Sequence, residues 1–91
     1  MENYIEKIKT LLESELKMVG TPYEKLLDVY ALLVFVKGEN CTNEDVHDAW
    51  SVWQNRTRPN HPSLIPFNKL SKVVQDLDSE YRDAIIKVSL C

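Results

Sequence analysis

Aromatic and cationic residues cluster in one stretch of this 91-residue chain. His47 and Trp50 are three residues apart, and so are Trp50 and Trp53, so on a helix their side chains form one row. Arg56 continues that row by one step. Because aromatic faces stack on bases and guanidinium groups bind phosphate bidentately, the stretch predicts a nucleotide-like ligand. The predicted ligand-binding residues are His47, Trp50, Trp53, Arg56, Arg58, His61 and Phe67.

The same tryptophans have a second interpretation. Val46, Ala49, Trp50 and Trp53 stand at positions i, i+3, i+4 and i+7. That spacing is typical of the buried face of an amphipathic helix, so the tryptophans could belong to the core. Periodicity favours this interpretation, and the sequence leaves open which tryptophan serves which purpose.

Other kinds of chemistry find less support. His47 and His61 with Asp48 match no zinc-binding spacing. Cys41 and His47 could be drawn as a nucleophile and its base, but no third residue that would orient them is evident. Only two glycines are present, so a phosphate-cradling glycine loop is excluded. We therefore expect a binding protein without catalysis, metal or cofactor.

Length and charge set further limits. A chain of 91 residues with 44% apolar residues has room for a single domain spanning 1–91, and a domain this small is often supplemented by oligomerisation. The net charge of −3 argues against binding to DNA or RNA. No apolar segment reaches the length of a membrane span, and the first residues do not resemble a signal peptide. The isolated Cys41 and Cys91 predict free thiols and a cytoplasmic location.

Residues 1–40 predict a pair of helices. Apolar residues at helical spacing indicate an amphipathic helix over 2–18, ended by Gly20. Thr21 as a cap with Glu24 three residues later predicts a helix over 22–37, stopping at Gly38. The apolar residues of this second helix surround most of its circumference, so we expect it to be buried between neighbours.

The remaining elements should position the aromatic cluster. Thr42 and Asp45 predict the start of a helix over 43–56. Three prolines within 57–67 predict an ordered, non-regular loop. A short helix over 71–77 and a last helix over 79–89, capped by Asp78, should follow. The predicted class is all-α, with four to five short helices and an ordered proline-rich loop, and a short strand pairing near the chain ends is left open.

Two segments resemble the RyR domain, the repeat module of ryanodine receptors. They are EDVHDAWSVW at 44–53 and HPSLIPFNKL at 61–70, and the similarity extends over roughly 42–88. The upstream segment around 26–38 is similar to small proteins of actinobacteria and their phages. The resemblance implies an RyR-domain-like fold and ligand binding without chemistry.

The resemblance also implies a role. In ryanodine receptors the modules form tandem pairs, so a single copy would form a homodimer or higher homo-oligomer. A phage protein of this kind would sequester a host immune signal, such as a cyclic dinucleotide or an ADP-ribose-type molecule, in the host cytoplasm. The alternative is a protein–protein adaptor that uses the Trp/Pro-rich surface.

Overall fold

A computed structural model describes residues 3–18 and 20–91, apart from the side chains of Thr21 and Pro22. Within these residues the chain is all-helical and contains no strand, which confirms the predicted class. The elements are α1 (Tyr4–Leu16), α2 (Thr21–Val36), the 3₁₀ helix η1 (Gly38–Asn40), α3 (Asn43–Asn55), the 3₁₀ helix η2 (Phe67–Lys69), α4 (Lys72–Asp76) and α5 (Ser79–Ser89).

Local signals explain most helix ends. The Asn3 side chain accepts a hydrogen bond from the backbone N–H of Glu6 at 2.8 Å and so caps α1. Thr42 and Asp45 form the capping box of α3, with reciprocal hydrogen bonds of 3.2 and 3.0 Å, so the predicted start is confirmed. The predicted start of the first helix at Glu2 lies outside the described residues.

The boundary between α1 and α2 differs from the prediction. Lys17, rather than Gly20, ends α1 by adopting the left-handed conformation, with a φ of 55°. Gly20 instead takes the N-cap position of α2, one residue before the predicted cap. The side chain of Thr21 lies outside the described part, so the predicted cap is not described. The stop at Gly38 is confirmed, because its φ of 54° suits a glycine after a helix.

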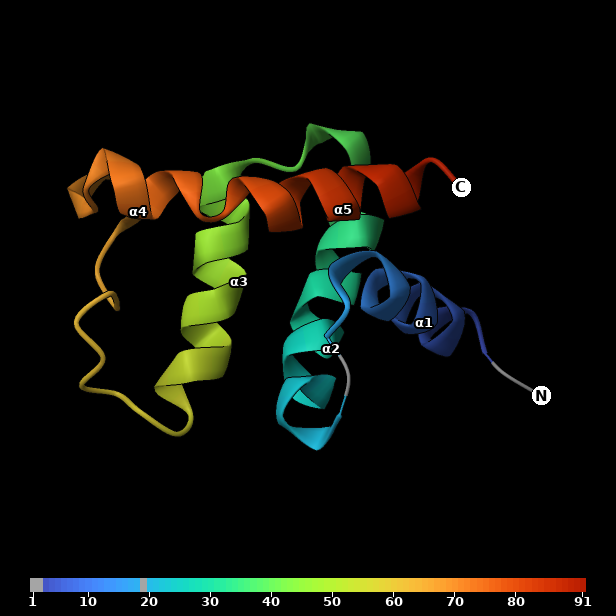
Figure 1. Cartoon of the computed structure of the whole chain (residues 1–91), viewed down its shortest axis with the longest axis horizontal. Helices are drawn as coiled ribbons and strands as arrows, with labels where there is room; N and C mark the ends of the chain where they lie inside the picture. Colours follow the sequence, from blue (N-terminus) through green and yellow to red (C-terminus); the bar gives the residue numbers. More distant parts are fainter. Residues whose placement is uncertain (1–2, 19) are drawn as a thin grey trace.

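The core lies where α5 crosses α1, α2 and α3 (Figure 1). Figure 1 shows α2 and α3 side by side, with α5 running across them, α4 lying beyond α3 and the proline-rich loop outside α3. The buried apolar residues are Leu12, Leu16, Met18, Leu26, Leu27, Tyr30, Ala31, Val34, Cys41, Val46, Ala84, Ile85 and Val88. No helix within the described residues has the length and hydropathy to cross a membrane.

The expectation that α2 is buried all round is wrong. Its inner face, with Leu27 and Tyr30, packs in the core, but Leu32, Phe35 and Val36 on the other face are exposed. The reason is that α1, α3 and α5 all contact α2 without enclosing it. Tyr4 of α1 contacts the Phe35 ring edge to face, with 5.3 Å between ring centroids.

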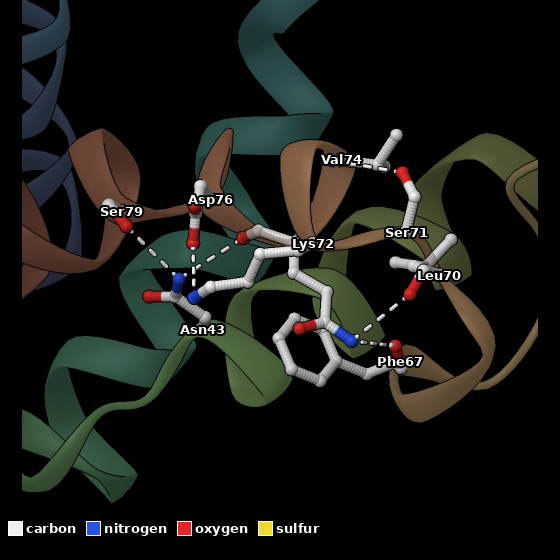
Figure 2. A network of polar contacts seen from close by, with 9 residues as sticks. Asn43, Phe67, Leu70, Ser71, Lys72, Val74, Asp76 and Ser79 are labelled. Atoms are coloured by element: carbon white, nitrogen blue, oxygen red, sulfur yellow. Dashed lines mark hydrogen bonds and ion pairs between the residues drawn. The ribbon is translucent and has the colours of Figure 1, made fainter.

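The short helix α4 is held by a polar network (Figure 2). The Asn43 side-chain amide donates to the Gln75 carbonyl and to Ser79 Oγ, both at 3.1 Å. Gln75 Nε2 donates to the carbonyls of Phe67 and Leu70 at 3.0 and 3.2 Å. These bonds fasten α4 to the start of α3 and to η2, so the end of the proline-rich loop is fixed in place.

Asp78 stands at the N-cap position of α5 but does not act as the predicted cap. Its backbone is helical, with φ −80° and ψ −11°, and its side chain forms no capping hydrogen bond. The carboxylate is therefore free to serve another purpose.

Candidate functional site

A cleft of about 420 Å³ opens between α2, α3 and the α4–α5 junction, and we call it the aromatic cleft. This volume lies within the range of small-molecule sites in proteins. The lining residues are Met18, Tyr23, Leu26, Tyr30, His47, Trp50, Trp53, His61, Ser63, Val74, Leu77, Asp78 and Tyr81. Five of them are tyrosines or tryptophans, so the walls are suited to a planar ring.

His47 connects the cleft to the proline-rich loop. Its side chain is only 4% exposed, and Nε2 donates to the Ile65 carbonyl oxygen at 2.7 Å. The ring stacks on Trp50 with 5.8 Å between centroids, and Phe67 lies against it at 6.1 Å. Because of the bond to Ile65, the ring orientation on the cleft wall is fixed.

Trp50 and Trp53 both line the cleft but differ in their ring contacts. Besides stacking on His47, Trp50 meets the His61 ring at 84°, with 5.0 Å between centroids. His61 is itself held, because its Nδ1 accepts a hydrogen bond from the Ser63 N–H at 3.0 Å, which leaves Nε2 as the protonated nitrogen of the neutral ring. Among the described residues no other ring stacks on Trp53, so this indole is the more available platform.

The structure brings four of the seven predicted site residues together. His47, Trp50, Trp53 and His61 all line the aromatic cleft. The other three lie elsewhere. Arg56 and Arg58 are exposed at and beyond the end of α3 and do not line the cleft. Phe67 lines a shallow depression beside Cys41 and Arg82.

Sequence reasoning missed the opposite wall of the cleft. Tyr30 and Tyr81 lie there with their rings 5.7 Å apart, close to Asp78. Burial raises the pKa of the Tyr30 hydroxyl far above its ordinary value, and Tyr81 and Asp78 add to the effect, so this group is a hydrogen-bond donor at neutral pH. Burial also raises the pKa of the Asp78 carboxyl, while nearby His47 opposes that rise. Helical periodicity places Tyr30 in the core and gave no signal that it borders a cleft.

The alternative chemistry at Cys41 has little basis in the structure. Both cysteines are free, as predicted, but Cys41 is buried, and burial raises the pKa of its thiol to about 11. A thiol with such a pKa is protonated at neutral pH and is a poor nucleophile. Across residues 3–18 and 20–91 there is no group of three or more His, Cys, Asp or Glu residues that could hold a metal ion.

Comparison with protein families identifies one relationship. The model of the family described as "Domain of unknown function (DUF7701)" matches residues 3–90. The chain belongs to this family. The DUF7701 match covers both the N-terminal helical pair and the portion from 42 to 88, and its description assigns no function. No curated protein and no solved structure matches the chain.

The DUF7701 match corrects the resemblance to the RyR domain. The matching family model covers nearly the whole chain, and it is not the RyR repeat family. The similarity rested on short segments around Trp50 and Pro62. In the structure these segments supply the start of α3, the bond from His47 to the loop and the turns between prolines, all of which are structural requirements of this fold.

Proposed function

We propose that this DUF7701 protein binds a small molecule with a planar heteroaromatic group, such as the base of a nucleotide-derived signal, without catalysing a reaction on it. The observation that carries this proposal is the aromatic cleft, which is lined by Trp53 from α3, Tyr30 from α2 and Tyr81 from α5. A planar ring entering the cleft would exchange water for aromatic contacts on both sides.

The positions of the arginines refine this proposal. Because Arg56 and Arg58 do not line the cleft, a phosphate group would have to lie outside it. The ring is therefore the part of the ligand that the cleft selects. Sequestration of a host immune signal, phage origin and location in the host cytoplasm followed from the RyR resemblance, and they stay predictions without support from the family match.

Replacing Trp53 with alanine should weaken ligand binding. Loss of one stacking face costs about 1–3 kcal/mol, which corresponds to roughly a tenfold to hundredfold higher dissociation constant. Thermal-shift screening against nucleosides, cyclic dinucleotides and ADP-ribose would identify a ligand, and calorimetry would compare the variants. Trp53→Phe should retain most of the affinity, and Val52→Ala, on the exposed side of α3, should retain all of it. If Trp53→Ala folds and binds like the wild type, the cleft is not the site.

We further propose that two copies of the chain associate through an apolar surface, the α1–α2 patch. Its exposed residues are Tyr4, Ile5, Leu32, Phe35 and Val36. The contact between the Tyr4 and Phe35 rings joins the two helices into one surface, and Leu32, Phe35 and Val36 share a helix face. Exposed apolar patches of this kind typically mark interfaces.

Phe35→Glu should shift the chain toward the monomer. Phe35 is 46% exposed, so the substitution disturbs little of the core but places a charge at the centre of the α1–α2 patch. We expect at least a tenfold rise in the dimer dissociation constant, measured by sedimentation equilibrium, since removal of a buried aromatic contact costs at least about 1.4 kcal/mol. Val73→Glu, an exposed site on α4, is the matched control. A wild-type chain that is monomeric at high concentration would contradict this proposal.

One observation favours the adaptor as a second candidate. Outside α3 lies a groove lined by His47, Asp48, Ser51, Val52, Asn55, Pro59, Leu64, Ile65 and Pro66, with exposed Val52 and Ile65 side chains. Proline-flanked apolar grooves can receive an extended peptide. The ligand screen separates the two candidates, because absence of any thermal shift would favour the adaptor.

A further inference from the structure

Charge is distributed unevenly in the aromatic cleft. Asp78 is the one aspartate, glutamate, lysine or arginine among its lining residues, so the cleft carries a carboxylate and no fixed cation. An anionic group is therefore disfavoured there, while N–H donors and positive charge are favoured. This preference for donors and positive charge differs from the phosphate binding that the sequence predicted.

The Asp78 carboxylate has no assigned task within the fold. Among the described residues it forms no hydrogen bond or ion pair, and it does not cap α5. In contrast, Asp76, two residues earlier, pairs with Lys72 at 2.8 Å on the exposed side of α4. A half-buried carboxylate without a hydrogen-bond partner is costly, and nearby His47 offsets only part of that cost, so a ligand that supplies N–H donors would be stabilised.

A second uncommitted polar group faces the same cleft. Tyr30 is 1% exposed and lines the cleft, yet its hydroxyl has no hydrogen-bond partner within the described part of the chain. Because Asn43 Oδ1 is the only fully buried side-chain polar atom without a partner in the described part of the chain, the Tyr30 hydroxyl is accessible from the cleft. His61 adds another donor, since its Nδ1 is occupied by the Ser63 N–H and its Nε2 carries the hydrogen. The cleft thus offers one carboxylate acceptor beside hydroxyl and imidazole donors.

We infer that the aromatic cleft selects a heterocycle whose edge carries two adjacent N–H donors next to a carbonyl, as guanine does. Asp78 would accept hydrogen bonds from the two donors, and Tyr30 would donate to the carbonyl oxygen. Adenine does not match, because its corresponding edge places an unprotonated ring nitrogen beside a single amino group. This inference rests on the proposed function and adds the chemical identity of the ring.

The test compares guanosine, inosine and adenosine by calorimetry. Wild-type protein should bind guanosine at least tenfold more tightly than inosine, which lacks the amino donor, since a hydrogen bond to a charged group contributes at least that much. Asp78→Asn should weaken guanosine binding at least tenfold. The variant should then bind adenosine more tightly than guanosine, because an amide both donates and accepts hydrogen bonds. Asp76→Asn, the matched control, should leave all three affinities within twofold of wild type.

Tyr30→Phe provides a second test that does not alter the α4–α5 junction. It should weaken guanosine binding at least threefold while leaving the thermal stability of the ligand-free protein unchanged or higher, because it removes an unpaired hydroxyl. Equal affinity for guanosine and inosine, or no effect of either substitution, would overturn the inference. Binding of another heterocycle that depends on Trp53 but not on Asp78 would overturn it and leave the proposed function standing. Failure of guanosine to bind overturns the inference too.

Discussion

Replacing His47 with alanine is expected to lower the free energy of unfolding by about 3 kcal/mol, from the loss of buried volume and of one hydrogen bond. His47 is buried, and its Nε2 bond to the Ile65 carbonyl joins α3 to the proline-rich loop. Removal of the ring also deprives Trp50 and Phe67 of a packing partner. Urea denaturation followed by circular dichroism would measure the change.

His61→Ala is the matched control for that experiment. The His61 ring is partly exposed and accepts one hydrogen bond from Ser63, two residues away. Its removal should cost about 1 kcal/mol, since local, partly solvated hydrogen bonds contribute little more than this. If the two histidine variants were equally stable, His47 would not be the residue that anchors the loop.

Replacing Ile85 with alanine should cost about 2–5 kcal/mol, the usual range for removing a large apolar side chain from a core. Ile85 is 0% exposed and lies in α5, the helix that contacts α1, α2 and α3 at once. These contacts join helices far apart in the sequence, so the cavity left by the alanine substitution would weaken the whole fold. Thermal and urea denaturation would both report the loss.

The neighbouring residue provides the control. Ile86 packs at the edge of the core and is partly exposed, so Ile86→Ala leaves a site that water can fill. We expect less than half the loss found for Ile85→Ala, because solvent-accessible sites form no enclosed cavity. The opposite order of stabilities would mean that α5 is rotated relative to the described packing.

Helix boundaries could be predicted from the sequence because their causes are local. The capping box of Thr42 and Asp45 and the stop at Gly38 depend on residues within one helical turn. Asp78 was predicted as a cap by the same reasoning, but its backbone is helical rather than extended, and its side chain does not accept from the N–H groups of the first turn of α5. The exposed face of α2 could not be predicted, since an apolar pattern does not say how many neighbours will cover it.

The candidate site was predictable on one wall only. His47, Trp50 and Trp53 share a helix, so their proximity follows from spacing alone. Tyr30 and Asp78 come from other elements and meet this wall only through the packing of α2 and α5 against α3. The arginines illustrate the converse, because closeness in sequence to Trp53 did not bring them into the cleft.

The most direct test of the central claim follows the two tryptophan indole N–H signals by NMR during titration with guanosine. The chain contains only these two tryptophans, so each signal is assigned by one substitution. We expect a saturable shift of the Trp53 signal, accompanied by backbone shifts around Tyr30 and Asp78. Saturable shifts confined to the groove outside α3 or to the α1–α2 patch, with the Trp53 signal unmoved, would contradict binding in the aromatic cleft.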